Sequence, residues 1–195
     1  PKDIIPRLHL IWNNLVSQLA KENKKYIYGM LKEGARAREF ESALSWLEDY
    51  GLVYKIYRVN KAGIPLKAYQ DMKAFKLYAL DVGLLGAMAG LSEKALLEGD
   101  VLFTHFKGAL TEQYVMQQLI SAGHRNLFYW SNESGQAEVD LITEYENVIY
   151  PIEIKSAENL QSKSLKTFSE KHKDIHCYRT SLSDFRKENW LTNVP

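Results

Sequence analysis

Two carboxylates and a lysine in the second half of the chain have side-chain types and a spacing that suit hydrolytic chemistry. Glu153 and Lys155 flank Ile154 in a β-branched stretch, so strand alternation predicts that both side chains point to one face of a sheet. Asp140 lies in the preceding apolar stretch, which predicts an adjacent strand. Glu112, early in a predicted helix, is a further acidic candidate. The spacing therefore predicts a carboxylate and lysine cluster.

This cluster has the composition of a site for metal-dependent phosphodiester hydrolysis. Hard divalent cations such as Mg²⁺ or Mn²⁺ bind carboxylate and carbonyl oxygens, which Asp140, Glu153, Glu112 and the Ile154 carbonyl would offer. Lys155 would orient the attacking water and balance charge on the phosphate. Alternatively, Glu153 and Lys155 only pair with each other and Asp140 is a strand-end carboxylate. Short acidic-x-basic strings are common, so spacing alone leaves both interpretations open.

The elements that must position this cluster form an α/β sandwich order. Hydrophobic periodicity and turn residues predict helix, three strands, helix and strand, an αβββαβ order, at residues 103–122, 127–130, 138–142, 148–155, 160–172 and 175–179. We expect this domain to cover residues 101–195. A linker at residues 90–99 separates it from a first domain, residues 1–90.

The first domain has the element order of a winged helix-turn-helix. A helix ending near Lys21 and a second helix over residues 37–50, stopped by Gly51, precede a predicted hairpin. The hairpin strands are residues 52–59 and 65–69, and they form the wing. Residues 75–80 predict another strand, and Asp81 is suited to cap the helix that follows.

Basic side chains of the first domain are the candidates for contact with DNA phosphates. We expect them to be exposed, and they are Lys32, Arg36, Arg38, Arg58 and Lys61. The helix over residues 37–50 argues against this, because several of its outward positions are acidic and would repel phosphates: Glu39, Glu41, Glu48 and Asp49. A winged helix that docks onto a protein is the alternative.

Composition excludes several classes of protein. The chain has 195 residues, 46% of them hydrophobic, and a net charge of +1, far from the basic excess of a dedicated nucleic-acid binder. A single cysteine, Cys177, excludes an internal disulfide and fits the cytoplasm. No apolar run reaches the roughly 20 residues of a membrane span. The chain begins at Pro1 without Met, which suggests a piece of a larger parent.

Several strings of the sequence resemble the domain of unknown function at the C-terminus of bacterial and archaeal AAA+ ATPases. In the second half they are KGALTEQYV at 107–115, YWS at 129–131, AEVDLI at 137–142, PIEIKS at 151–156 and KSLK at 163–166. In the first half they are ARAREFE at 35–41, ALSWLEDYGL at 43–52, PL at 65–66 and FKLYALDVGLL at 75–85. The resemblance spans nearly the whole chain.

The resemblance implies a winged helix followed by a restriction-endonuclease-like PD-(D/E)xK fold. It places the acidic motif positions at Asp140 and Glu153, the motif lysine at Lys155 and the helix acid at Glu112. Val139 stands where the motif has proline, and many members of the superfamily are inactive.

The resemblance also implies an AAA+ ATPase domain that precedes Pro1 in the parent chain. The sequence printed here contains no Gly-Lys pair and hence no P-loop, so ATP would bind only through that domain. The expected function is a nucleic-acid-binding, nuclease-like module of such an ATPase, with DNA as a candidate partner. The alternative is a non-catalytic domain that docks the ATPase onto a protein.

Overall fold

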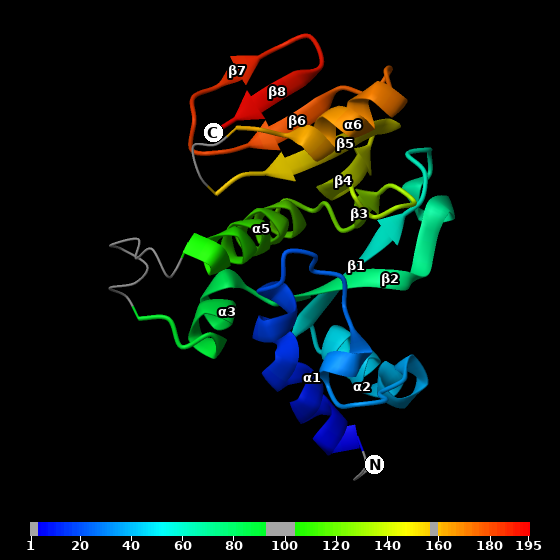
Figure 1. The fold of residues 1–195 in the computed structure, drawn as a ribbon, viewed down its shortest axis with the longest axis vertical. Helices are drawn as coiled ribbons and strands as arrows, with labels where there is room; N and C mark the ends of the chain where they lie inside the picture. The colour runs from blue at the N-terminus through cyan, green and yellow to red at the C-terminus, as the bar shows by residue number, and fades with distance from the viewer. Residues whose placement is uncertain (1–3, 93–103, 157–159) are drawn as a thin grey trace. The chain divides into compact units, whose positions relative to one another are not determined.

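The computed structural model describes residues 4–92, 104–156 and 160–195, and in these ranges it shows five α-helices and a mixed sheet of eight strands (Figure 1). The chain divides into two compact units, each built from two segments. The first unit comprises residues 1–56 and 74–113, and the second comprises residues 57–73 and 114–195. The expected linker at residues 90–99 lies largely outside the described residues.

Two amphipathic helices form the core of the first unit. In α1 (Ile4–Leu19) the buried side chains include Ile11, Leu15 and Leu19, which recur every four residues on one face. In α2 (Ala37–Asp49) the buried stripe includes Phe40 and Leu44, and the two helices pack together. Gly51, at φ +67°, follows α2 in the left-handed region that glycine adopts without strain. Both predicted helices and the glycine stop are confirmed.

The predicted hairpin is only half correct. Strand β1 (Val53–Val59) forms as expected, but residues 65–69 are not the returning strand. Leu66–Tyr69 is a short 3₁₀ helix, and the strand beside β1 is β2 (Gln70–Ala79), which includes most of the separately predicted strand at 75–80. The reason is that the backbone N–H of Leu66 donates a hydrogen bond of 2.7 Å to Glu144 Oε2. This N–H is therefore not available to a strand ladder.

Helix α3 (Val82–Met88) begins where the sequence predicts. The Asp81 side chain accepts a hydrogen bond from the Leu84 backbone N–H at 2.8 Å, which is the expected N-cap. Helix α5 (Thr104–Ser121) follows, and Gly123 beyond it has φ +96°. The unit boundary falls within α5, between Gln113 and Tyr114.

The second unit shows the predicted αβββαβ order and adds a C-terminal strand pair. Its elements after α5 are β3 (Leu127–Ser131), β4 (Glu138–Tyr145), β5 (Val148–Ile154), α6 (Lys163–Lys171), β6 (Cys177–Thr180), β7 (Arg186–Lys187) and β8 (Leu191–Val194). The strand order of the sheet is β2-β1-β3-β4-β5-β6-β8-β7. The sheet is mixed, because β4 is antiparallel to β3 and β5 whereas β6 is parallel to β5 and β8.

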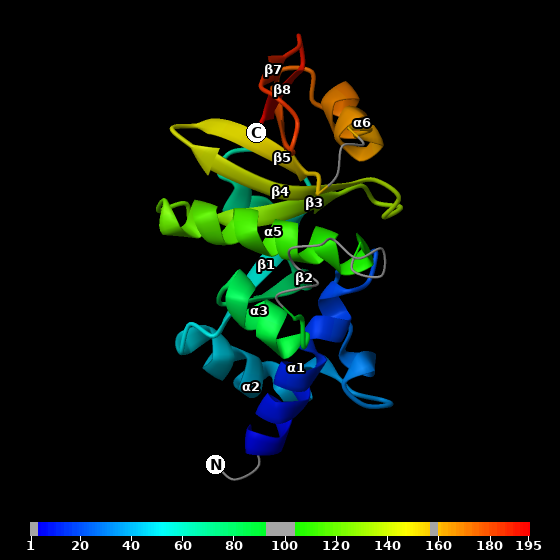
Figure 2. The ribbon, with the colours of Figure 1, turned by 90° about the vertical axis from the view of Figure 1, so that its left-hand side faces the viewer.

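Helix α6 covers one face of this sheet (Figure 2). Its buried Leu165 and Phe168 pack in a core cluster with Ile142 of β4, Ile149 of β5 and Cys177 of β6. Burial raises the pKa of the Cys177 thiol to about 12, so the thiol is protonated at neutral pH. Cys177 is therefore a core residue.

No helix in the described ranges combines the length and the apolar composition that crossing a membrane requires.

Candidate functional site

Asp140, Glu153 and Lys155 meet where strands β4 and β5 lie side by side. Asp140 Oδ2 accepts a hydrogen bond of 2.8 Å from the backbone N–H of Ile154, the residue between Glu153 and Lys155. The strands are antiparallel with Leu141 opposite Ile152, and one further step in this register places Asp140 opposite Glu153. The structure thus brings together the three motif residues of the second unit.

The glutamate and the lysine of this group form a close ion pair. Lys155 Nζ lies 2.7 Å from Glu153 Oε1, and the Glu153 side chain is 8% exposed whereas that of Lys155 is 26% exposed. The backbone N–H of Lys155 also donates to the Thr180 carbonyl at 2.9 Å, which holds the end of β5 against β6. The acid is therefore buried, and the base beside it stays accessible to solvent.

Strand alternation places Glu153 on the α6 face of the sheet. Ile142 and Ile149 pack in the core cluster with the buried side of α6. Glu153 lies four residues from Ile149 in β5 and so shares its face, whereas the pairing of β3 with β4 shifts register between Val139 and Ile142, so alternation along β4 does not set the face of Asp140. The hydrogen bond from the Ile154 N–H, and not strand alternation, holds the Asp140 carboxylate at the strand end that carries Glu153 and Lys155.

The donors at this position fit a hard divalent cation. Among the residues that the structure describes, no three His, Cys, Asp or Glu side chains form a group able to hold a metal ion. Asp140 and Glu153 supply two carboxylates, and the main-chain carbonyl of Ile154 is a third oxygen nearby. Mg²⁺ usually keeps several waters and needs only one or two carboxylates, so this set suits Mg²⁺ or Mn²⁺ and does not suit zinc.

Glu112, the fourth predicted residue, lies in the first unit and takes its partners there. Its Oε1 is 2.7 Å from Lys24 Nζ, and its Oε2 accepts a hydrogen bond of 3.0 Å from the Tyr78 hydroxyl. Lys76 Nζ, on a side chain only 1% exposed, lies 4.0 Å from the same Oε2. Glu112 thus joins a buried cluster of two lysines and a tyrosine, with Lys24 88 residues away in the sequence.

Electrostatics keep the Glu112 carboxylate ionised. Burial alone would raise its pKa, but the charges of Lys76 and Lys24 and the hydrogen bonds from Lys24 and Tyr78 act in the other direction. The pKa of Glu112 consequently lies below its ordinary value. A buried carboxylate with these partners anchors α5 to β2 and to the segment that carries Lys24.

The predicted DNA-contacting cations divide between the two units. Lys32, Arg36 and Arg38 belong to the first unit and are exposed, and Lys32 pairs with Glu39 at 3.2 Å. Arg58 and Lys61 belong to the second unit. Arg58 is not the exposed cation that we expected: its side chain is 26% exposed and bonds to Asp71 at 2.5 Å, because β1, which carries Arg58, lies next to β2, which carries Asp71.

The acidic outward side of α2 is partly neutralised within the first unit. Glu48 is 2.6 Å from Lys55 Nζ, and Glu39 pairs with Lys32. The hydrogen bond from Lys32 is the main cause that lowers the pKa of Glu39. Glu41 and Asp49 remain exposed. This surface therefore keeps negative positions beside the basic Arg36 and Arg38.

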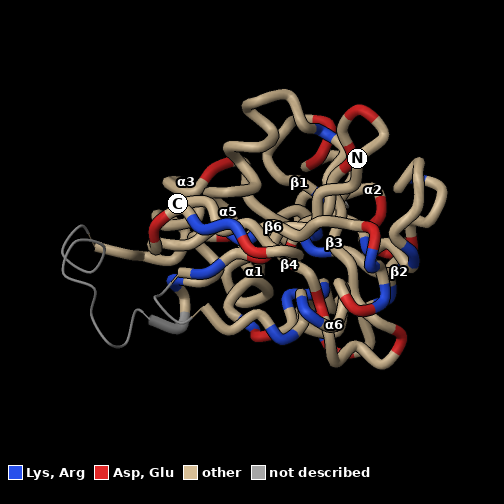
Figure 3. The backbone as a smooth tube through the Cα atoms, turned by 90° about the horizontal axis from the view of Figure 1, so that it is seen from above, with Lys and Arg blue, Asp and Glu red and all other residues tan. Residues whose placement is uncertain are grey.

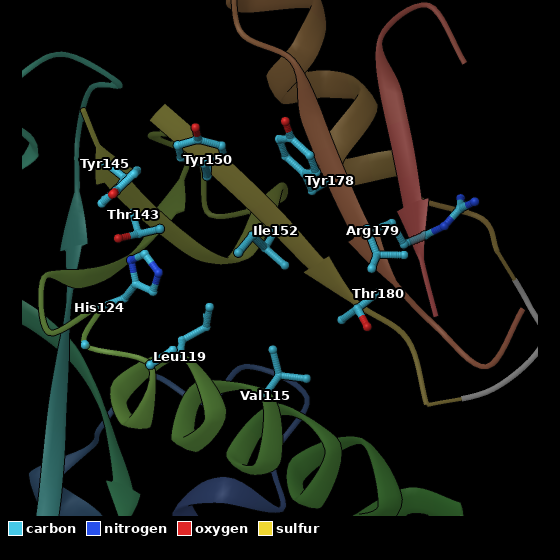
Figure 4. Close-up of a pocket in the computed structure, with 13 residues that line it drawn as sticks. Val115, Leu119, His124, Thr143, Tyr145, Tyr150, Ile152, Tyr178, Arg179 and Thr180 are labelled. Carbon is cyan, nitrogen blue, oxygen red and sulfur yellow. The ribbon is translucent and has the colours of Figure 1, made fainter. Parts of the chain in front are cut away.

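An apolar groove of about 620 Å³ lies on the opposite face of the second unit's sheet (Figure 4). Val115 and Leu119 of α5 point toward Ile152 of β5. The rings of Tyr150 on β5 and Tyr178 on the neighbouring β6 have centroids 5.5 Å apart. His124 and Tyr145 stand at its other end, with ring centroids 5.6 Å apart. No local pattern of the sequence indicates this groove, because its lining comes from five separate elements and a loop.

Arg179 is a residue of the site region that the sequence analysis missed. It lies directly opposite Glu153 in the parallel pairing of β5 and β6, and it is 6% exposed. Its guanidinium donates to Asn193 Oδ1 at 2.9 Å and to the Leu160 carbonyl at 2.7 Å. The signal in the sequence for Arg179 is its position as a basic residue within the short strand β6 (Cys177–Thr180).

Comparison with known proteins finds two family models. Residues 2–95 match a domain of unknown function, DUF8612, and this range includes Arg36, Arg38, Arg58 and Lys61. No curated protein and no solved structure shows significant similarity to the chain. Residues 107–194, which include Glu112, Asp140, Glu153 and Lys155, match the model of a second domain of unknown function, DUF4143.

Proposed function

We infer that this chain is a nucleic-acid-binding module whose second unit carries a nuclease-like site of the PD-(D/E)xK type. One observation carries the proposal: the Asp140 carboxylate bonds to the backbone between Glu153 and Lys155, so an acid, a second acid and a lysine from adjacent strands occupy one position. Such a group suits hydrolysis of a phosphodiester, because the reaction needs stabilisation of anionic charge and an oriented water.

Each side chain would have a distinct part. Asp140, whose Oδ2 accepts the Ile154 N–H, and Glu153 would hold Mg²⁺ or Mn²⁺ through their carboxylate oxygens, and the Ile154 carbonyl would be a further oxygen ligand. The bound cation would supply Lewis-acid activation of the phosphate. Lys155, held 2.7 Å from Glu153 and accessible to solvent, would donate to a phosphate oxygen and orient the water. Glu153 positions that ammonium group through their ion pair.

The element order of the first unit supports a winged helix as a second nucleic-acid contact. Helices α1 and α2 precede strand β1, and Arg36 and Arg38 lie exposed at the start of α2. The resemblance to the C-terminal domain of AAA+ ATPases supports a parent chain in which an ATPase domain binds ATP. In that arrangement the ATPase would be the partner of this module.

A non-catalytic docking domain is the second candidate, and the groove of the second unit favours it. A groove of about 620 Å³, lined by Val115, Leu119, Tyr150 and Tyr178 among others, suits a protein segment better than a phosphate. On this alternative the carboxylates and Lys155 only hold strands β4, β5 and β6 together. Cleavage assays separate the two candidates.

The test is a cleavage assay with single-stranded and duplex oligonucleotides, with Mg²⁺, with Mn²⁺ and with EDTA. We expect slow metal-dependent cleavage that both Asp140→Asn and Lys155→Ala abolish. The matched control is Lys173→Ala, an exposed lysine after α6, which should cleave as the unaltered chain does. Cleavage that persists in Asp140→Asn overturns the assignment of the site, and silence of the unaltered chain with every metal and substrate favours docking.

A further inference from the structure

A basic hollow lies in the second unit between the start of α6, strand β6 and the β7 and β8 pair. Its volume is about 470 Å³, and its charged lining residues are Lys163, Lys166, Arg179, Arg186 and Glu188. Four cations thus face one carboxylate, whereas the whole chain carries a net charge of only +1. The local excess of positive charge favours an anionic ligand.

The two lysines of the hollow lie on α6, where Figure 3 shows basic positions, and both side chains are at least partly exposed. Lys163 and Lys166 are three residues apart, so they lie on neighbouring positions of one helix face. Neither forms a salt bridge within the part of the chain that the structure describes. Both charges are therefore available to a ligand.

The two arginines differ in how firmly they are held. Arg179 is buried, and its hydrogen bonds to Asn193 and Leu160 occupy two of its five N–H donors and fix the plane of its guanidinium. Arg186 is 72% exposed and pairs with Glu188 at 3.2 Å, a contact that solvent screens. The hollow thus combines one buried, hydrogen-bonded cation with exposed cations, an arrangement that suits phosphate oxygens.

The hollow lies beside the candidate catalytic group. Glu153 and Arg179 are direct partners in the pairing of β5 and β6, and partners in a parallel ladder point to the same face. Glu153 is in turn bound to Lys155 and lies opposite Asp140. A polyanion that crosses this face would meet the basic hollow and the carboxylates in succession.

We propose that this hollow binds a backbone phosphate of a nucleic-acid strand and so positions the neighbouring phosphodiester against Asp140, Glu153 and Lys155. The inference rests on the proposed function, since it takes the strand to be the substrate of that group. It adds a binding site formed by Lys163, Lys166, Arg179 and Arg186, none of which takes part in the chemistry. A chain of phosphates explains both the excess of cations and their place next to the carboxylates.

The test measures binding alone, in EDTA, by fluorescence anisotropy of a labelled single-stranded oligonucleotide over a range of NaCl concentrations. The variant is the double substitution Lys163→Ala with Lys166→Ala. We expect the Kd to rise about tenfold and the slope of log K against log salt to fall by about one to two, because two phosphate contacts are lost. The control is Lys173→Ala with Lys187→Ala, which removes the same charge from exposed positions that do not line the hollow.

The outcomes separate this inference from the proposed function. If the unaltered chain binds the oligonucleotide and the Lys163 and Lys166 variant binds as tightly as the control, the hollow is not a phosphate site and only this inference fails. If the unaltered chain binds no nucleic acid, the proposed function fails as well. Binding of inorganic phosphate that is lost in the variant, without binding of the oligonucleotide, would overturn the nucleic-acid assignment in favour of a small-anion site. Circular dichroism melting of both double variants shows that they fold.

Discussion

Asp140 has a structural contact and a proposed chemical role, and substitutions can separate the two. Its Oδ2 accepts the Ile154 N–H at 2.8 Å, and this contact needs only an acceptor oxygen, whereas holding a divalent cation needs the negative charge. Asparagine keeps an acceptor and loses the charge. Alanine loses both.

We therefore predict that Asp140→Ala lowers the free energy of unfolding by about 1 to 3 kcal/mol, because the Ile154 N–H loses its partner. Asp140→Asn should cost much less, and both variants should lack metal-dependent cleavage. Urea denaturation followed by circular dichroism measures the first effect, and the oligonucleotide assay measures the second. Equal destabilisation by the two substitutions would show that the charge, not the hydrogen bond, holds the strand end.

Glu112 gives a prediction on pH. Its pKa in the folded chain lies below the ordinary value, so the ionised carboxylate stabilises the fold above that ordinary value and the contribution is lost as the pH falls through the folded pKa. Glu112→Gln removes the buried carboxylate that pairs with Lys24 and lies 4.0 Å from Lys76, and it should cost about 3 to 5 kcal/mol near neutral pH. The difference in melting temperature from the unaltered chain should shrink as the pH is lowered into the acidic range.

Two further variants test that explanation. Glu39→Gln, which removes an exposed partner of Lys32, should leave the melting temperature nearly unchanged. Lys76→Met in the Glu112→Gln background should recover part of the lost stability, because it removes a buried charge that no longer has the Glu112 carboxylate beside it. A constant difference in melting temperature across the pH range would contradict the role of the Glu112 charge.

At the scale of single elements, capping decides where α3 begins. The Asp81 carboxylate accepts the Leu84 N–H at 2.8 Å, one of the backbone donors that the first turn of a helix leaves unsatisfied. Strand β2 ends at Ala79, so this cap also sets the short connection between strand and helix. The same residue therefore serves two elements.

We predict that Asp81→Ala lowers the free energy of unfolding by about 0.5 to 2 kcal/mol, and that Asp81→Asn, which keeps the acceptor, costs less. Urea denaturation of the three chains measures the difference. Asp174→Ala serves as a control, because Asp174 is exposed between α6 and β6. Loss of stability in Asp174→Ala equal to that in Asp81→Ala would argue against a specific cap.

Considered as a whole molecule, the chain has too little net charge to bind a polyanion through its overall field. The balance of 25 basic and 24 acidic residues means that any nucleic-acid binding must come from local clusters, such as Arg36 and Arg38 in the first unit and Lys163 and Lys166 in the second. Contacts of this kind release counterions, so affinity should fall steeply as salt is added.

We predict that Arg36→Ala with Arg38→Ala weakens oligonucleotide binding and leaves the melting temperature nearly unchanged, since both side chains are exposed. Arg58→Ala should instead lower the melting temperature, because it removes the half-buried ion pair with Asp71. Anisotropy titrations and thermal melts of the same preparations distinguish the effects. Affinity that does not change with salt would favour the docking alternative over nucleic-acid binding.

Local pattern in the sequence was sufficient for most elements and for the core of the candidate site. The periodicity of α1 and α2, the glycine after α2, the Asp81 cap and the αβββαβ order all depend on residues within about four positions of one another, which is the range that helix and strand periods report. The pairing of Glu153 with Lys155 is equally local, because strand alternation brings residues two apart to one face.

Only the tertiary structure decided the contacts between distant segments. Glu144 captures the Leu66 N–H from 78 residues away and so turns a predicted strand into a 3₁₀ helix. Lys24 reaches Glu112 across 88 residues. The register of β5 and β6 places Arg179 beside Glu153 and creates a basic hollow that no short motif indicates. These pairings follow from how helices and strands pack, and the period of a single segment carries no information about its distant neighbour.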